Sequence, residues 1–527
     1  MTLEAGAYGA TEGLGLRVGS HTTVEGGEPV RRHEDVVVDE RHQRRAGFAD
    51  TRVARRIQAA RPPVADVTHP VARRHLGGGV ARAVVHDDDF VHRAGALAGE
   101  RSEGHVQVGR SVARGYHDRD LGQLLVDTRA GHRPGSVARP MRVLVVHNRY
   151  RVEGGEERSV ELQLRALSRA RVEHGVLERR STETNRAGAA LALLRGGRDE
   201  DHVGAAIREL RADVAHVHNM LPLVGPRGLE AARAAGARVV LHLHNARLFC
   251  AIAVASRDGG PCFRCHHRFT LPGLVLNCRG SLPEATVYAA ALALHQPAVF
   301  ETVDRFVAPS AYAVGQLAKL GVPAARLEML AHYVPAEAFA DRSRAAEGRY
   351  ALVASRLSAE KGIDLAIAAA ARAGVPLKVA GEGPAAEELR RTTDRLNAPV
   401  DFLGRVDRER MAMLLAGAGA VLMPSRYHEF SPFAALEAMA AGVPVLAARL
   451  GGLPELVGTD RCVAPGDHDA MAERLRELWD DPDRRSAEGE ALLARARERH
   501  SEERYLEALL DLYQRLKCES SRTTAVQ

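Results

Sequence analysis

An α/β fold of two parallel-sheet domains is the fold class that the sequence predicts, and two observations lead to it. After Met141, short apolar segments alternate with helical segments in two separate series. Before Met141 no such period develops, because runs such as RR, DDD and GGG interrupt the valines. Strands that alternate with helices are typical of parallel sheets covered on both faces. We therefore expect two domains facing across a cleft, preceded by an extension without a core.

The extension, residues 1–140, is arginine-rich and contains neither lysine nor cysteine. Two interpretations remain open: a disordered segment of the working protein, or sequence from a mis-assigned start that precedes the true start at Met141. A nucleic-acid-binding arm is disfavoured because acidic residues nearly balance the arginines, so we expect no nucleic-acid partner.

The overall composition predicts a cytoplasmic protein. The chain has 527 residues, is 45% hydrophobic and carries a formal net charge of +6. No apolar run reaches the roughly 20 residues that span a bilayer, and the N-terminus lacks a secretory signal pattern. The mild positive charge allows at most a peripheral contact with the inner face of the plasma membrane.

Residues 141–342 are predicted to form the first Rossmann-like domain. Helices are expected over Glu156–Ser168 and Gly228–Ala235, between buried strands. The expected strands are Arg142–His147, Val214–His218, Arg238–His244 and Arg305–Pro309.

Residues 343–490 are predicted to form the second Rossmann-like domain, after a polar linker over Asp341–Gly348. Residues 491–527 are expected to be a C-terminal helix, Glu502–Lys517, and a disordered tail. Tandem domains of this kind bind ligands between the carboxyl ends of their strands. The expected strands are 350–355, 376–381, 400–404, 420–425 and 444–448, and the expected helices are Asp364–Ala373, Ala385–Leu396, Arg408–Ala416 and Pro432–Ala441.

The segment MPSRYHEFSPFAALEAMAAGVPV carries the strongest chemical signal. Glu429 lies in a loop before a helix with Ser431 as its expected N-cap and Pro432 at its first position. Glu437 is the only charged residue of that apolar helix, where a ribose would satisfy a buried carboxylate. The helix N-terminus suits a phosphate. Alternatively, Glu437 is exposed or paired with an arginine, and Glu429 is an ordinary turn residue.

Two cations flank the strand-to-helix turn ASRLSAEKG. Arg356 and Lys361 can converge on one side of the cleft and neutralise a diphosphate leaving group. The alternative is two solvated charges in a surface loop.

Further candidate residues lie at or just after the ends of three predicted strands. Gly154 and Gly155 follow the first strand and allow close backbone approach to a phosphate, or form an ordinary turn. His244 is expected to point into the cleft, although a histidine at a strand end is more often structural. His218 and Asn219 are placed similarly and are weaker candidates for an acceptor pocket.

From Met141 to about Tyr513 the chain resembles the retaining glycosyltransferases of family 4, the group-1 type with the two-domain GT-B fold. The matching motifs occur in order: the Gly154-Gly155 loop, HVHN at 216–219, LHN at 243–245, SRLSAEKG at 355–362, GEGP at 381–384, and the E-x7-E pair of Glu429 and Glu437. One departure is LAHYVPAEAF at 330–339, where the family commonly has a proline-asparagine pair.

The resemblance implies transfer of a sugar from a nucleoside-diphosphate sugar to a lipid-linked or saccharide acceptor, in cell-surface polysaccharide or glycolipid assembly. It implies that Arg356 and Lys361 bind the donor diphosphate and that Glu437 binds the ribose. It also implies that Gly155 closes over the phosphates when the domains shut. Glu429 would contact the reacting sugar and His244 would line its pocket. No cofactor is implied for catalysis. The alternatives are a non-catalytic nucleotide-sugar-binding subunit and a sugar-nucleotide epimerase on the same fold.

Four cysteines form a separate cluster in an insertion at 250–278. Their count and one CxxC pair match a structural zinc site, and the reducing cytoplasm disfavours disulfides. The alternative is four unligated thiols in a lid loop, and His266 or His267 would compete as ligands. The cysteines are Cys250, Cys262, Cys265 and Cys278.

Overall fold

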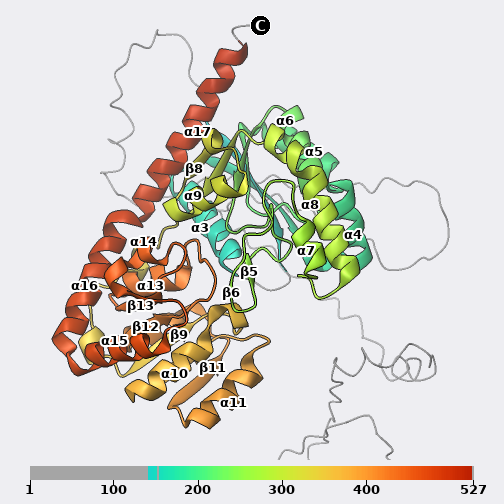
Figure 1. Cartoon of the computed structure of the whole chain (residues 1–527). Coiled ribbons are helices and arrows are strands. Elements are labelled where there is room, and N and C mark those ends of the chain that lie inside the picture. Colours follow the sequence, from blue (N-terminus) through green and yellow to red (C-terminus); the bar gives the residue numbers. More distant parts are fainter. Residues whose placement is uncertain (1–139, 151–153, 525–527) are drawn as a thin grey trace, which may run out of the picture. The chain divides into compact units, whose positions relative to one another are not determined.

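The computed structural model describes residues 140–150 and 154–524, with side chains up to Glu519 (Figure 1). The extension over residues 1–140 lies outside these residues except for Pro140, so both interpretations of it stay predictions. No described helix is long and apolar enough to cross a membrane.

The first domain is built on a six-stranded sheet in the order β2-β1-β3-β4-β7-β8, with all neighbouring strands parallel. Strand β1 has a continuous apolar run, and its side chains alternate between the two faces. Its strands are β1 (Arg142–Arg149), β2 (Glu173–Arg180), β3 (Val214–Val217), β4 (Arg238–His242), β7 (Arg305–Ala308) and β8 (Leu327–Met329).

Helices cover both faces of this sheet. Leu144 and Val146 face one layer, while Val143 and Val145 face the other. The first layer contains α4 (Arg186–Arg195), α5 (Glu200–Leu210), α6 (Gly225–Ala234), α8 (Leu282–Thr302) and α9 (Ala311–Leu320), and the second contains α3 (Gly155–Arg169) and α17 (Glu502–Thr524).

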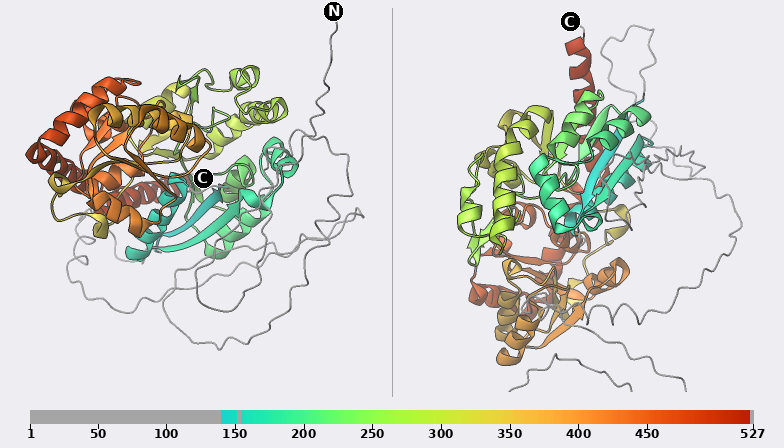
Figure 2. Two further views of the ribbon diagram at one scale, coloured as in Figure 1. Left: turned by 90° about the horizontal axis from the view of Figure 1, so that it is seen from below. Right: turned by 90° about the vertical axis from the view of Figure 1, so that its right-hand side faces the viewer.

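The second domain repeats the architecture with a parallel sheet in the order β11-β10-β9-β12-β13-β14. Its strands are β9 (Tyr350–Ala354), β10 (Leu377–Ala380), β11 (Val400–Gly404), β12 (Ala418–Met423), β13 (Val445–Ala448) and β14 (Cys462–Val463). Its helices are α10 (Ile363–Ala373), α11 (Ala386–Leu396), α12 (Arg408–Ala416), α13 (Phe433–Ala440), α14 (Leu453–Val457), α15 (His468–Asp480) and α16 (Pro482–Arg499). In Figure 2, which gives two further views, the first domain runs from cyan to yellow and includes the red helix α17, and the second domain runs from gold to red.

Three local expectations differ from the structure. Pro432, not Ser431, is the N-cap of α13, because its backbone is extended (φ −74°, ψ 129°) and the helix begins at Phe433. Strand β4 ends at His242, so His244 lies in the following loop. Helix α17 continues to Thr524 through most of the tail expected to be disordered.

The insertion after β4 is mostly irregular. It holds a two-stranded hairpin, β5 (Ser256–Arg257) and β6 (Gly260–Pro261), and one short helix, α7 (Leu271–Val275). Helix α7 packs beside α8, and Thr270 Oγ1 donates to the carbonyl of Ala289 at 2.7 Å. The insertion is thereby attached to the helical layer of the first domain.

Candidate active site between the two domains

A buried ion pair joins Lys361, in the turn between β9 and α10, to Glu429, in the loop between β12 and α13. Lys361 Nζ lies 2.7 Å from Glu429 Oε1 and donates to Tyr427 Oη at 2.9 Å. Glu429 also accepts from Ser425 Oγ at 2.9 Å and from Tyr427 Oη at 2.6 Å. Burial alone would lower the pKa of Lys361, but Glu429 and Tyr427 raise it above its usual value. Lys361 is therefore cationic at every physiological pH.

A glycine turn holds this loop in place. An added Cβ at Gly451 would lie 2.4 Å from the carbonyl oxygen of Glu429, and Gly451 has a φ of +62°. The next residue, Gly452, donates its backbone N–H to the same carbonyl at 2.7 Å. The GGLPELV segment thus fixes the position of Glu429 through backbone contact that a side chain would prevent.

Glu437 lines a cavity bordered by elements of both domains. Arg158 of α3 and Arg408 of α12 border the same cavity, together with Val406 and Met411. Burial raises the pKa of the Glu437 carboxyl, and the two arginines partly offset this. No described residue donates a hydrogen bond to this carboxylate, so it is available to a ligand.

Arg356 does not join these groups. Its side chain is 55% exposed and pairs with Glu360 Oε1 at 2.5 Å. The structure therefore brings Lys361 and Glu429 together but leaves Arg356 on the surface side of the turn.

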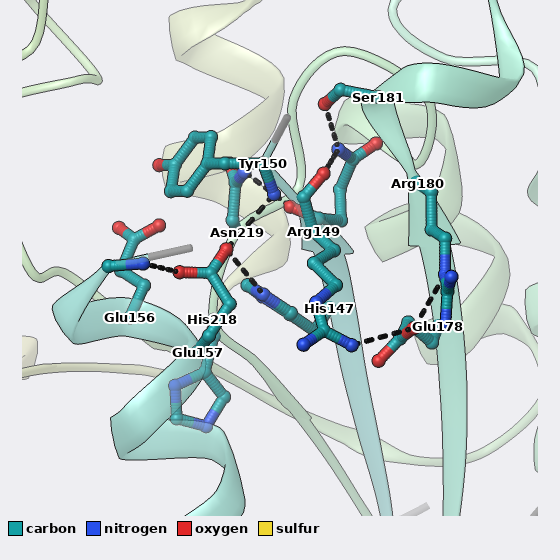
Figure 3. Close-up of polar contacts among 12 residues, drawn as sticks. His147, Arg149, Tyr150, Glu156, Glu157, Glu178, Arg180, Ser181, His218 and Asn219 are labelled. Carbon is teal, nitrogen blue, oxygen red and sulfur yellow. Dashed lines mark hydrogen bonds and ion pairs between the residues drawn. The ribbon is translucent and has the colours of Figure 1, made fainter. Parts of the chain in front are cut away.

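Glu157 links the residue after β1 to the residue before α3 (Figure 3). Its carboxylate accepts backbone N–H groups of Gly154 at 2.7 Å and Tyr150 at 3.0 Å, and lies 3.6 Å from His147 Nε2. Burial alone would raise the pKa of Glu157, but His147 and the backbone N–H groups lower it to about 2. Glu157 occupies the capping-box position of α3, a signal that sequence analysis could have used.

Gly155 brings the two domains into contact. An added Cβ at Gly155, the first residue of α3, would lie 3.6 Å from Phe433 Cδ2, the first residue of α13. The N-termini of the two helices therefore lie next to each other. Both ends carry unpaired N–H groups and partial positive charge, which suit a phosphate.

His218, Asn219 and His244 line one small cavity with Glu156 and Arg247. The Asn219 amide is occupied, because it donates to the Asn148 carbonyl at 2.6 Å and accepts from Leu221 N at 3.1 Å. Asn219 thus shapes the cavity rather than offering a free group.

The hydrogen bonds of His218 determine which ring nitrogen of His244 carries the proton. Gln163 Oε1 can only accept, so His218 Nε2, 2.7 Å away, carries the proton. His218 Nδ1 then accepts from His244 Nε2 at 2.9 Å. His244 Nδ1 is left as a lone pair, and no described residue contacts it by a hydrogen bond.

A parallel chain runs through His216 to His242. Gln163 Nε2 donates to Tyr513 Oη at 2.9 Å, and Tyr513 in turn donates to His216 Nδ1 at 2.8 Å. His216 Nε2 donates to His242 Nδ1 at 3.4 Å, which leaves the His242 proton on Nε2. Sequence analysis missed this chain, although HVH and HLH on adjacent strands place four rings on one face.

His332 completes the cluster. Its Nδ1 donates to the Ser431 carbonyl at 3.2 Å, leaving Nε2 as a lone pair, and its ring stacks on Phe433 at 4.5 Å. The rings form two groups of three, and within each group one nitrogen of every ring lies within 4.8 Å of the other two. The first group is His242, His244 and His332, and the second is His216, His218 and His242. A metal would need three lone pairs, whereas the first group offers one N–H and two lone pairs. That set suits a ligand hydroxyl.

Burial keeps these rings neutral. It lowers the pKa of His216 to about 3 and that of His332 to about 4, and it also lowers the pKa of His218, His242 and His244. Neutral imidazoles both donate and accept hydrogen bonds, as sugar hydroxyls require.

The second domain matches a known family. Residues 336–493 match the model described as Glycosyl transferases group 1, a range that contains Arg356, Lys361, Glu429 and Glu437. A 150-residue stretch is 40% identical to the GDP-mannose-dependent monoacylated alpha-(1-6)-phosphatidylinositol monomannoside mannosyltransferase of Corynebacterium glutamicum. The match covers 26% of this chain and 39% of that relative's length.

Two solved structures share the whole two-domain arrangement. Anabaena HepE in complex with UDP gives a TM-score of 0.52 at 18% identity, covering 71% of this chain and 100% of the other. Sucrose-phosphate synthase from Thermosynechococcus elongatus gives 0.53 at 18% identity, covering 72% and 100%. The expected α/β architecture of two Rossmann-like domains, GT-B, is confirmed.

Proposed function

We propose that this chain, whose residues 336–493 belong to the glycosyl transferases group 1, transfers a sugar from a nucleoside-diphosphate sugar to a lipid-linked or saccharide acceptor, with retention. The observation that carries the proposal is the buried pair between Lys361, before α10, and Glu429, in the loop before α13, the helix that also carries Glu437. The relative in Corynebacterium glutamicum is GDP-mannose-dependent by its name, and HepE was crystallised with UDP, which supports a donor of this class.

The second domain binds the donor in this proposal. Glu437 accepts the ribose hydroxyls, because its carboxylate lines the cavity without a donor of its own. Lys361 and the N-terminus of α13 stabilise the charge that develops on the diphosphate as the glycosidic bond breaks. Glu429 holds Lys361 in place and contacts the sugar. Arg356, which is exposed, reaches the diphosphate by leaving Glu360 when the donor binds.

The first domain binds the acceptor and the reacting sugar. His244 Nδ1 and His332 Nε2 accept hydroxyl protons, and His242 Nε2 donates to a hydroxyl oxygen. Gly155 and Phe433 keep the two domains close, which excludes water from the reacting bond. Catalysis uses no cofactor in this account.

A peripheral membrane contact follows for a lipid-linked acceptor. Large apolar side chains of α4, α7 and α8 are exposed on the first domain, with the exposed arginines Arg186 and Arg195 on α4. Apolar groups beside cations suit an anionic lipid surface. The exposed apolar residues are Leu191 and Leu194 on α4, Leu271 and Val275 on α7, and Leu282 and Leu294 on α8.

The experiment that tests the function is a transfer assay with a panel of nucleoside-diphosphate sugars and a bacterial lipid extract. We expect nucleoside diphosphate to be released with one donor only, at a higher rate when acceptor lipid or saccharide is added. Binding without release would favour a non-catalytic subunit. Recovery of an epimerised nucleotide sugar without transfer would favour an epimerase.

A further inference from the structure

The four cysteines of the insertion converge on one cavity. Cys250 lies in the loop after β4, Cys262 and Cys265 follow the β5–β6 hairpin, and Cys278 follows α7. All four line the same cavity, none is in a disulfide, and each is only partly exposed. Residues that are up to 28 positions apart in sequence thus line one cavity.

The backbone after Cys250 folds into a tight turn that meets the CxxC pair. The N–H of Ala253 donates to the Cys250 carbonyl at 2.9 Å, and the N–H of Cys262 donates to the Ala255 carbonyl at 2.7 Å. Ala253 and Ala255 have positive φ values of 68° and 46°, which are uncommon for residues with a side chain. The chain adopts an unfavourable conformation at two positions there, which brings Cys250 and Cys262 to the same turn.

We propose that Cys250, Cys262, Cys265 and Cys278 bind one zinc ion in a tetrahedral, structural site. Zinc is bound by thiolates at about 2.3 Å, and four cysteines leave no open position for catalysis. No three of these described sulfurs lie within 4.8 Å of one another, so zinc binding draws the cavity together. Each thiol loses its proton on binding, so one zinc ion displaces up to four protons.

The zinc ion fixes the insertion against the donor-binding loop. Phe263 lies inside the CxxC pair, and its ring meets that of His428 edge-on at 5.0 Å. His428 precedes Glu429 and also contacts the hydroxyl of Tyr312. A cross-linked CxxC turn therefore holds Phe263 beside the loop that carries Glu429, the partner of Lys361.

The test is elemental analysis of full-length protein purified without a histidine tag. We expect about one zinc ion per chain in the wild type and in the matched controls Cys462→Ser and Cys518→Ser, whose cysteines lie outside the insertion. The double variant Cys262→Ser/Cys265→Ser should lose the metal. To separate loss of metal from loss of folding, the wild type is also alkylated in the native state. Zinc release, followed with a colorimetric chelator, should then rise in step with modification of the four cysteines.

Two results would overturn the assignment. One is a wild-type zinc content well below one per chain, with the four thiols as reactive as the exposed Cys518. The other is zinc that persists in the double variant but is lost in His242→Asn, which places the metal at the histidine cluster. Neither readout uses enzymatic activity, so they stand apart from the proposed transfer reaction.

Discussion

Lys361 Nζ and Glu429 Oε1 lie 2.7 Å apart, and both side chains are largely buried. Lys361, which we propose binds the donor diphosphate, is therefore held in place by Glu429, which we propose contacts the sugar. Removing either partner leaves the other charge buried and unpaired, which costs about 3–5 kcal/mol.

The first prediction concerns this pair. Lys361→Ala and Glu429→Ala should each abolish most transfer and lower the midpoint of urea unfolding, while the double variant recovers stability but not activity. Arg356→Ala is the matched control, because its exposed pair with Glu360 is worth about 0–1 kcal/mol. It should lose activity about ten- to a hundredfold, as for a hydrogen bond to a charged group, with unfolding unchanged. Additive losses in the double variant would contradict the coupling.

The second prediction concerns Gly451. Gly451→Ala should displace the Glu429 carbonyl, because its Cβ would lie 2.4 Å from that oxygen, and should reduce both stability and turnover. Gly466→Ala is the control, since Gly466 also has a positive φ, +83°, but nothing lies within 4 Å of its added Cβ. It should lose about 1 kcal/mol of stability and keep its turnover. Equal turnover in the two variants would show that Gly451 does not position Glu429.

The third prediction is a loss of stability in mild acid. A histidine with a folded-state pKa below its unfolded value of about 6.5 stabilises the fold fully above that pH and loses this contribution as pH falls. Folded-state pKa values of about 4 for His332 and about 3 for His216 place the loss between about pH 6.5 and 3.

Each such histidine contributes about 1.4 kcal/mol per pH unit within that window. The melting temperature measured from pH 8 to pH 4 should fall steeply below pH 6.5, and His332→Asn should flatten the fall. A melting temperature that is constant down to pH 4 would mean that the cluster is not buried and neutral.

The fourth prediction concerns Phe263. Phe263→Ala should keep the zinc ion but raise the KM for the donor severalfold, because the ring no longer supports His428 beside Glu429. Phe269→Ala, an exposed aromatic residue of the same insertion, should leave both properties unchanged. Steady-state kinetics and zinc content of the two purified variants provide the check.

Much of the fold was predictable because the apolar period of each strand and helix is local. Helix α12 has its predicted bounds, Arg408–Ala416, and α10 differs from them by one residue. Strands β3 and β4 end earlier than predicted. His218 and His244 are compatible with a strand by pattern, but they bond to each other by their side chains in the loops beyond.

Long-range contacts were not predictable in the same way. The pattern of α17 indicates an amphipathic helix but not its partner, and its Tyr513 contacts His216 and Gln163 of the first domain. Likewise, His332 has no neighbouring signal in sequence and joins the site through long-range contacts with Phe433, Ser431 and His244. Arg158 was missed because a helical arginine carries no motif, although it borders the cavity of Glu437.

The central claim is that a nucleoside-diphosphate sugar binds beside Glu437. The most direct measurement is the melting temperature of the full chain with a panel of nucleoside diphosphates and their sugars, because a ligand at a hundred times its Kd adds about 2.7 kcal/mol of stability. We predict a clear rise with one nucleotide class and its loss in Glu437→Gln, while Glu488→Gln on α16 keeps the rise. No rise with any nucleotide, or the same rise in wild type and Glu437→Gln, would contradict the account.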